Sequence, residues 1–239
     1  MPYIDIENLS HMWGKKRALD SVSFRVDSGQ FCALLGPNGA GKSTLFGILT
    51  GLFSAHSGRV RVAGHDLSLA PRLALSELGV VFQQQTLDLD LTVWRNMLYF
   101  AGLHGMSGKV AKIAAAEALD RLGMVSRGSE RVRDLNGGHR RRLEIARSLM
   151  HGPSVLLMDE PTVGLDAKAR QVIIDHAHAL AHDLGLCVLW ATHLTDEVRS
   201  GDRLVILDQG LVLEDGIATE TGQALTEHFL NLTQDRQAA

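Results

Sequence analysis

The sequence predicts an α/β fold in which helices cover a largely parallel β-sheet, with an N-terminal antiparallel β subdomain and an inserted all-helical subdomain. Continuous apolar runs of four or five residues are typical of strands buried on both faces, as found in parallel sheets. A helical stretch separates two of these runs, as a parallel crossover requires. A central stretch of the chain carries helix signals only.

The first third of the chain predicts strands around one glycine-rich turn. Polar and apolar residues alternate over three stretches, which predicts half-exposed strands: Tyr3–Leu9, Val22–Val26 and Arg59–Ala63. The continuous run Phe31–Leu35 predicts a strand buried on both faces. After the glycine-rich stretch 36–41, a helix is expected over Ser43–Thr50, with Gly51 as its stop.

The last third supplies the rest of the parallel core. Three apolar runs predict its strands: Val155–Met158, Leu186–Trp190 and Leu204–Leu207. Ala167–Leu184 lies between the first two runs and is long enough to be the crossover helix. A turn at Gln209-Gly210 followed by a strand over Leu211–Glu214 predicts a hairpin after the third run.

The middle of the chain predicts helices and a different charge. The helices are expected over Val93–Leu103, Val110–Leu122 (with Ser107 as N-cap and Gly123 as stop) and Gly138–Met150. Residues 84–150 hold 11 Lys and Arg against 7 Asp and Glu, a net +4, so the remainder of a chain of net charge -3 carries -7. We expect one domain over residues 1–225, with a core from 1–83 and 151–225, a helical insertion at 84–150, and a tail at 226–239.

Composition excludes several classes of protein. With 239 residues, 45% of them apolar, the chain can fill a real core, which excludes a small disulfide-held scaffold. Cys32 and Cys187 lie within apolar runs and are expected to be buried hydrophobes rather than a disulfide. No apolar run approaches the roughly 18–20 residues that cross a bilayer, and no secretory signal is visible. We therefore expect the chain to stay in the cytoplasm.

One motif carries the strongest functional signal. Gly36-Pro37-Asn38-Gly39-Ala40-Gly41-Lys42-Ser43 fits the pattern G-x-x-x-x-G-K-[ST] between a buried strand and a helix, with Thr44 next in the same site. Glycines let successive backbone N–H groups turn inward as an anion nest, and the helix N-terminus adds its positive dipole end. Lys42 is expected to contact β- and γ-phosphates, and Ser43 to offer its hydroxyl to Mg²⁺.

A pair of carboxylates ends the apolar strand at Val155–Met158. Asp159 lies at the carboxyl end of a predicted parallel strand, where such sheets place ligands, and is expected to hold Mg²⁺ through water. Glu160, one residue further, could accept a proton from the attacking water. By itself such a pair is often only a solvated strand end, but the upstream phosphate motif favours catalysis.

A third motif makes the set recognisable. Leu135-Asn136-Gly137-Gly138-His139, followed about twenty residues later by Asp159-Glu160-Pro161-Thr162, resembles the nucleotide-binding subunit of ATP-binding-cassette (ABC) transporters. The resemblance covers residues 3–216 and implies a P-loop NTPase (RecA-like) core that binds and hydrolyses ATP with Mg²⁺. In that family a loop reading L-S-G-G-Q closes on the γ-phosphate held by the opposite subunit of a head-to-tail homodimer. Gly137 and Gly138 match this loop, whereas Asn136 and His139 replace its serine and glutamine.

Four further positions match the family singly. Gln83 resembles the glutamine that links Mg²⁺ and the attacking water to the helical subdomain and the membrane partner. His193 resembles the switch histidine, whose imidazole would hydrogen-bond the γ-phosphate. Asp166 looks like the aspartate of the loop that crosses the dimer interface, and Trp13 falls where a tyrosine normally stacks on adenine.

The resemblance implies a transport ATPase that lies on the cytoplasmic face of the inner membrane and works with a membrane permease. The stretches 80–84, 87–92 and 135–142 look like subunits linked to pyrroloquinoline-quinone-dependent alcohol oxidation in Gram-negative bacteria, which are similar to daunorubicin-type exporters. A soluble ABC ATPase acting on DNA or ribosomes, and a P-loop kinase, stay open as alternatives. The transported substrate is not encoded, because in this family it contacts the membrane subunits.

Other polar clusters predict little. The arginines of Arg140-Arg141-Arg142 lack interleaved aromatic residues, so we expect no nucleic-acid partner. His176, His178 and His182 fall on one predicted helix, and we interpret them as a solvated face because no carboxylate or cysteine completes a metal site in sequence. His139 can titrate near physiological pH, where the family's glutamine cannot, which predicts a pH dependence of dimer closure that His139→Gln removes. The alternative, that His139 only packs or caps beside Arg140 without affecting closure, stays open.

Overall fold

The computed structural model describes residues 2–234, which form two sheets. The first sheet is antiparallel, in the order β2-β1-β4-β5, with these bounds: β1 Ile4–Trp13, β2 Lys16–Val26, β4 Ser57–Val62 and β5 His65–Asp66. The second has the order β10-β9-β3-β8-β7-β6 and is parallel apart from β10: β3 Phe31–Leu35, β6 Leu78–Val81, β7 Val155–Asp159, β8 Cys187–Thr192, β9 Arg203–Asp208 and β10 Leu211–Ile217. The predicted α/β class is confirmed.

Two apolar cores lie on opposite faces of the second sheet. Alternate side chains of β3 enter different cores: Phe31 packs with the helices, whereas Cys32 and Leu34 pack with the antiparallel sheet and helix α1 (Lys42–Leu49). The run is continuously apolar because both faces of the strand are buried. Cys32 and Cys187 are buried free thiols, and burial raises the pKa of each.

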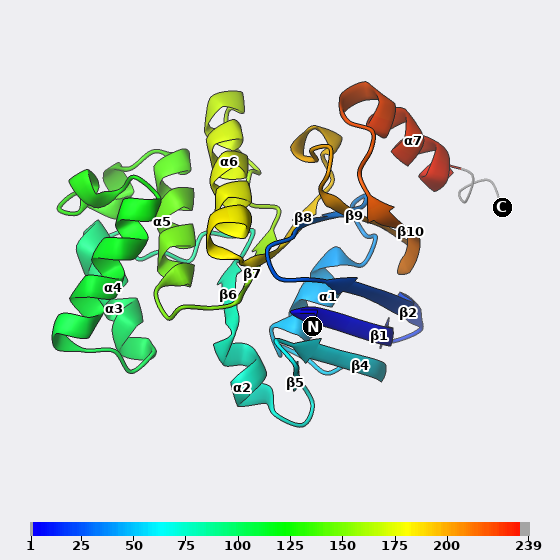
Figure 1. The fold of residues 1–239 in the computed structure, drawn as a ribbon, viewed down its shortest axis with the longest axis horizontal. Coiled ribbons are helices and arrows are strands. Elements are labelled where there is room, and N and C mark those ends of the chain that lie inside the picture. The colour runs from blue at the N-terminus through cyan, green and yellow to red at the C-terminus, as the bar shows by residue number, and fades with distance from the viewer. Residues whose placement is uncertain (1, 235–239) are drawn as a thin grey trace.

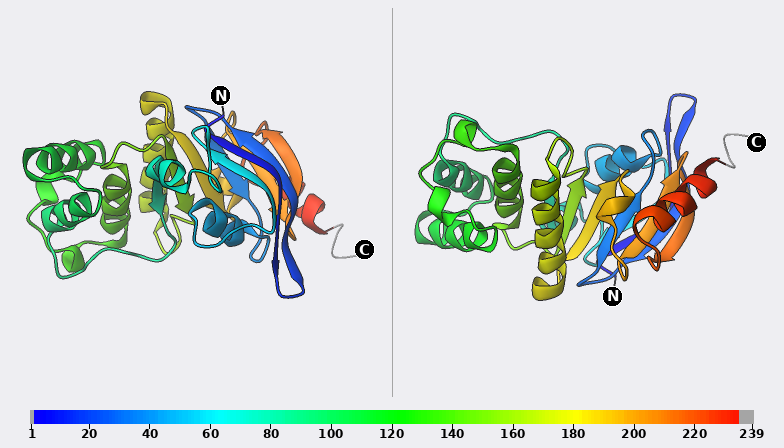
Figure 2. Two further views of the ribbon diagram at one scale, coloured as in Figure 1. Left: turned by 90° about the horizontal axis from the view of Figure 1, so that it is seen from below. Right: turned by 90° about the horizontal axis from the view of Figure 1, so that it is seen from above.

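Residues 84–150 form helices, which gather at one end of the molecule in both views of Figure 2. Their bounds are α3 Val93–Leu103, α4 Gly108–Arg121, the short 3₁₀ helices η1 Val125–Arg127 and η2 Val132–Asp134, and α5 Gly137–Leu149. The crossover helix α6 (Ala167–Leu184) lies between this group and the strands in Figure 1. Its apolar side packs into the core that contains Phe31.

The C-terminal helix α7 (Gly222–Gln234) lies at the opposite end of the molecule in Figure 1 and runs across the boundary at 225/226 where we expected a tail. Leu225 and Phe229, one helical turn apart, pack into the core. The hydroxyl of Thr226 lies 2.6 Å from that of Thr195 in the 3₁₀ helix η3 (Thr195–Glu197), so α7 contacts the loop after β8.

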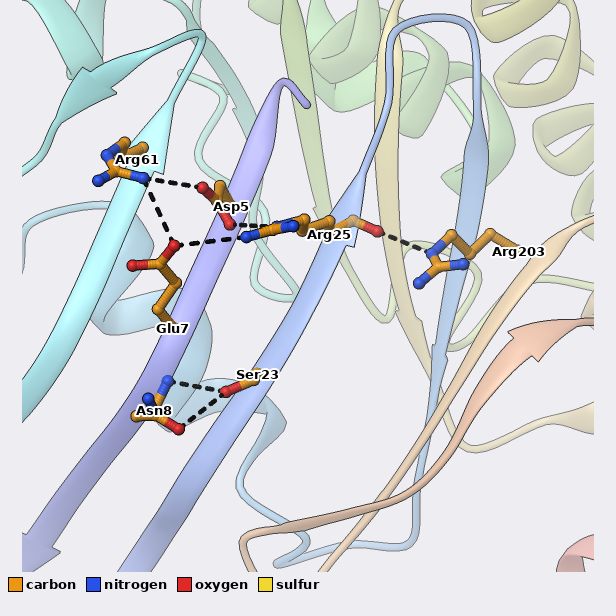
Figure 3. A network of polar contacts seen from close by, with 7 residues as sticks. All are labelled: Asp5, Glu7, Asn8, Ser23, Arg25, Arg61 and Arg203. Atoms are coloured by element: carbon orange, nitrogen blue, oxygen red, sulfur yellow. Dashed lines mark hydrogen bonds and ion pairs between the residues drawn. The ribbon is translucent and has the colours of Figure 1, made fainter. Parts of the chain in front are cut away.

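A polar network crosses the outer face of the antiparallel sheet (Figure 3). Asp5 on β1 accepts from Arg25 Nε at 2.8 Å and from Arg61 Nη1 at 3.0 Å, so it joins three strands. Arg203 on β9 donates to the carbonyl of Arg25 at 2.7 Å, which ties the second sheet to the first. Asn8, at a bulge with φ 48°, is held by the Ser23 hydroxyl.

The structure adds short elements that sequence patterns did not indicate. Strand β6, strand β5 and helix α2 (Pro71–Ser76) are each six residues or fewer, too short to show a hydrophobic period. Strand β1 extends to Trp13 through bulges that interrupt its alternation. Among the described residues no helix is long and apolar enough to cross a membrane.

Candidate functional site: the phosphate cradle and the carboxylate beside it

The glycine-rich loop 36–41 turns sharply between β3 and α1. A Cβ on Gly36 would lie 2.3 Å from the carbonyl oxygen of Leu207, and one on Gly41 would lie 2.6 Å from that of Ala18. Gly41 also has φ 113°, a conformation that side chains rarely adopt. Both positions therefore require glycine, and the loop can bring its backbone close to a ligand.

Lys42 is buried within its own loop. Its side chain is 5% exposed, and Nζ donates to the carbonyl oxygens of Gly36 at 2.5 Å and Pro37 at 3.1 Å. Burial lowers the pKa of Lys42, while the carboxylates of Glu160 and Asp159 act in the opposite direction. The ammonium is thus held by backbone dipoles and neighbouring carboxylates at the start of α1.

The other candidate catalytic side chains surround the carboxylate of Glu160. Gln83 Nε2 donates to its Oε2 at 3.1 Å, His193 Nδ1 lies 3.3 Å from its Oε1, and Lys42 Nζ lies 3.6 Å from the same oxygen. The His193 contact lacks hydrogen-bond geometry, so among the described residues that ring nitrogen has no hydrogen-bond partner. Glu160 has φ 43°, a left-handed conformation that costs about 1–2 kcal/mol for a residue with a Cβ.

Sheet topology explains this convergence. The strands β6, β7, β8 and β3 are mutually parallel, so their carboxyl ends meet at one edge of the sheet. Gln83, Glu160, His193 and the glycine-rich loop each follow one of these strands. Side chains separated by more than 100 positions in the chain are thereby placed together.

The residues that we expected to bind Mg²⁺ offer suitable oxygen atoms. Ser43 is exposed and Asp159 half-buried, and burial together with the charge of Glu160 raises the pKa of Asp159, against the effect of Lys42. No group of three or more His, Cys, Asp or Glu within residues 2–234 could hold a metal by itself. This donor set fits Mg²⁺, which commonly binds through one or two protein oxygens together with phosphates and water.

A cavity of about 200 Å³ extends from the phosphate cradle, residues 36–43, to the side chain of Trp13. Predicted residues line most of it: Trp13, Pro37, Asn38, Gly39, Ala40, Gly41, Lys42, Ser43, Thr44 and Glu160. Trp13 is 52% exposed, its Nε1 donates to Thr44 Oγ1 at 3.3 Å, and Phe53 packs edge-on against its ring at 4.9 Å. Lys16 and Ala18 also line the cavity, and no sequence signal marked them.

The signature loop, Leu135–His139, which resembles the family's L-S-G-G-Q loop, lies elsewhere on the same chain. None of Asn136, Gly137 and Gly138 lines the cavity around the cradle. Asn136 caps α5, since its Oδ1 accepts from the backbone N–H of His139 at 2.9 Å, which leaves its amide nitrogen to donate. Asp166 likewise caps α6 by accepting from Ala169 at 2.8 Å.

Arg141 and Glu144 connect helix α5 to the loop that carries Gln83. Arg141 is 4% exposed and donates to the carbonyls of Phe82 at 2.7 Å and Gln83 at 3.0 Å, and to Glu144 at 2.9 Å. Glu144 accepts from the N–H of Thr86 at 2.8 Å. Sequence reasoning missed this role, because nothing in the arginine run shows which guanidinium is buried.

The interpretation of His178 as part of a solvated helix face is wrong. His178 is 6% exposed, stacks on Phe31 with ring centroids 3.9 Å apart, and lies 2.9 Å from Asp202 Oδ1 through Nε2. His182, on the same helix, is exposed as expected. The i, i+4 spacing of these two histidines cannot show which one meets the sheet, because that depends on the rotation of α6 about its axis.

Comparison with known proteins identifies the family. The family described as "ABC transporter" matches residues 19–163. This chain belongs to the ABC transporter family. It is 35% identical over 218 residues to linearmycin resistance ATP-binding protein LnrL of Bacillus subtilis (strain 168), covering 91% of this chain and 70% of that protein. It is 39% identical over 220 residues to doxorubicin resistance ATP-binding protein DrrA of Mycobacterium tuberculosis (strain ATCC 25618 / H37Rv), covering 92% and 66%.

Solved ABC structures share the fold. The dimeric structure of MJ0796, a bacterial ABC transporter cassette, superposes with a TM-score of 0.78 at 28% identity, covering 90% of this chain and 98% of that one. The ADP conformation of MJ1267, an ATP-binding cassette, superposes with a TM-score of 0.82 at 25% identity, covering 96% and 99%. The chain is therefore an ABC ATPase, the ATP-binding subunit of an ABC transporter, with a P-loop NTPase fold.

Proposed function

We propose that this ABC ATPase powers an exporter, and that each ATP is bound between the cradle 36–43 of one copy and Asn136–Gly138 of a second copy. The observation that carries the proposal is the separation of these two elements: the signature loop does not line the cavity around the cradle in its own chain. The amide of Asn136 and the N-terminus of α5 offer donors to an anion that another copy presents.

The cradle and its neighbours suit phosphate binding and hydrolysis. Lys42 and the backbone of 36–41 bind phosphates, and the indole of Trp13 stacks on the base. Ser43, Asp159 and Gln83 would hold Mg²⁺, which would neutralise charge on the phosphates. Glu160 accepts a proton from the attacking water, and His193 Nδ1, which has no hydrogen-bond partner within residues 2–234, lies 3.3 Å from its Oε1.

The relatives support export as the direction of transport. One is named a doxorubicin resistance ATP-binding protein, and another, 36% identical over 232 residues and 95% of this chain, is the Nod factor export ATP-binding protein I of Paraburkholderia xenovorans (strain LB400). The proposed partner is a membrane permease, which this chain would bind at the cytoplasmic face of the inner membrane. A permease gene of about six spans beside this one would support this proposal, and quinoprotein dehydrogenase genes would support the finer subgroup linked to pyrroloquinoline quinone.

Dimerisation tests the shared site. In a Glu160→Gln background, the chain with ATP and Mg²⁺ should elute as a dimer in size-exclusion chromatography, because ATP binds but is not hydrolysed. Asn136→Asp keeps an oxygen that caps α5 and adds a charge that favours a helix N-terminus, yet it repels the phosphate of the second copy. We expect Asn136→Asp to stay monomeric and Asn136→Ser, which keeps both cap and donor, to dimerise. Dimers of equal stability in both variants would contradict the proposal.

A further inference from the structure

Glu197 is a buried carboxylate in η3, outside the cavity around the phosphate cradle. It is 1% exposed and ends the 3₁₀ helix η3. Its Oε2 accepts from Trp190 Nε1 at 2.9 Å, and its Oε1 accepts from the hydroxyl of Thr162. No Lys, Arg or His within residues 2–234 forms an ion pair with it. Two neutral donors therefore satisfy a carboxyl group whose burial without hydrogen bonds would be costly.

The two donors come from the segments that carry the candidate catalytic groups. Thr162 follows Glu160 by two residues at the end of β7, and Trp190 precedes His193 by three on β8. The last backbone bond that joins these segments runs from Glu160 N–H to the carbonyl of Ala191, at 3.0 Å. Beyond it the chain of β7 leaves the sheet, whereas β8 continues to Thr192 beside β3, and Glu160 has the left-handed φ of 43°.

We propose that Glu197 is a positioning residue that fixes the separation of Glu160 and His193. Its carboxylate joins the turn after Glu160, which lies beyond the last backbone bond between β7 and β8, to Trp190 within β8, and Glu197 itself follows His193 by four residues. The 3.3 Å between Glu160 Oε1 and His193 Nδ1 depends on this link. The inference rests on the catalytic roles given to both residues under the proposed function.

A purely structural role for Glu197 gives a different result. If the carboxylate only stabilised the fold, losing a donor would lower the free energy of unfolding while the molecules that remain folded would turn over normally. A positioning role instead predicts a fall in kcat with nearly unchanged ATP affinity. Glu197 does not line the cavity around the cradle 36–43, and its two hydrogen bonds go to Thr162 and Trp190.

Thr162→Val tests the link with the least change in shape, because valine replaces the hydroxyl with a methyl group. In the full chain, with ATP binding measured separately to count folded molecules, we expect kcat to fall at least about tenfold, since small misplacements of reacting groups have large effects on rate. ATP affinity should stay within about threefold of wild type, because uniform binding is untouched. Glu197→Gln, which can accept from Trp190 and donate to Thr162, should restore most activity relative to Glu197→Leu.

Thr233→Val provides the matched control, because Thr233 is also buried and its hydroxyl bonds only within α7. It should leave kcat unchanged. In a His193→Ala background, Thr162→Val should cost much less than in wild type, since the distance that it disturbs no longer matters. An unchanged kcat in Thr162→Val, or equal effects in both backgrounds, would overturn the inference. Glu160→Gln separates the two proposals: normal turnover of that variant would refute the assigned site itself.

Discussion

Lys42 and Glu160 face one another across the end of the sheet, with Nζ 3.6 Å from Oε1 and side chains only 5% and 12% exposed. The lysine begins α1 and the glutamate follows β7, so the pair joins the phosphate cradle to the carboxylate that would activate water. Burial lowers the pKa of Lys42 and the neighbouring carboxylates oppose that effect. The charge of Lys42 therefore depends on the carboxylates beside it.

Lys42→Ala is expected to lower ATP hydrolysis by at least about a hundredfold, because it removes a preorganised cation from the site where phosphate charge develops. ATP affinity should fall as well, as measured by equilibrium binding of a fluorescent ATP analogue. Lys15→Ala removes an exposed lysine that does not line the cavity and is the control. Equal ATPase rates in Lys42→Ala and Lys15→Ala would contradict the assignment.

Asp159→Asn should stabilise the protein in the absence of nucleotide and Mg²⁺ while impairing catalysis. A raised pKa in the folded state means that ionised Asp159 opposes folding: stability is greatest below the ordinary Asp pKa and is lost as the pH rises through the raised value. At pH 7 we expect the amide to raise Tm by about 2 °C or more, and to lower Mg²⁺-dependent hydrolysis at least about tenfold.

Calorimetry with and without Mg-ATP checks both parts of the Asp159 prediction. Asp183→Asn, which changes an exposed aspartate, should leave Tm unchanged. A lower Tm for Asp159→Asn at pH 7 would show that burial of the charge is not the dominant effect.

Trp13→Ala should weaken ATP binding about tenfold, because stacking of an aromatic side chain on a base contributes about 1–3 kcal/mol. Trp13→Tyr keeps a ring at this position and should bind almost as well. Trp13 is 52% exposed and lines the cavity, whereas Trp190 is fully buried and Trp94 lies in α3 away from the cavity lining. Quenching of tryptophan fluorescence by ATP should therefore disappear in Trp13→Tyr. Quenching that persists in that variant would place the base elsewhere.

His139 should affect dimer closure only in acid. Burial lowers its pKa, as do Arg142 and Arg127, while Glu130 acts in the opposite direction. The ring is therefore neutral at pH 7, and any stability that this neutral form provides is lost as the pH falls through the lowered pKa. The pH window that we expected near neutrality moves below the ordinary value of 6.5.

Dimerisation of the Glu160→Gln chain between about pH 5.5 and 8 tests the His139 prediction, because this range brackets the ordinary pKa of histidine. The profiles with and without His139→Gln should separate only below about pH 6.5. Superimposable profiles would mean that His139 only packs beside the start of α5.

Local sequence determined the phosphate cradle and the long elements of this protein. The predicted bounds of β3, α3 and α6 agree with the structure, because a continuous apolar run or several helical turns repeat a signal often enough to be recognised. The conformation of residues 36–41 is likewise local, since it follows from where glycine is required and where Lys42 begins a helix.

Only the tertiary structure decided which distant side chains share a site. Glu160, Gln83 and His193 meet because parallel pairing aligns the ends of three strands, and the burial of Arg141 follows from the rotation of α5 against the loop. Glu197 gave no sequence signal, since its partners Thr162 and Trp190 become neighbours only through that pairing. Hydrophobic patterns fix which face of a strand or helix is buried, whereas such contacts depend on register and packing between elements far apart in the chain.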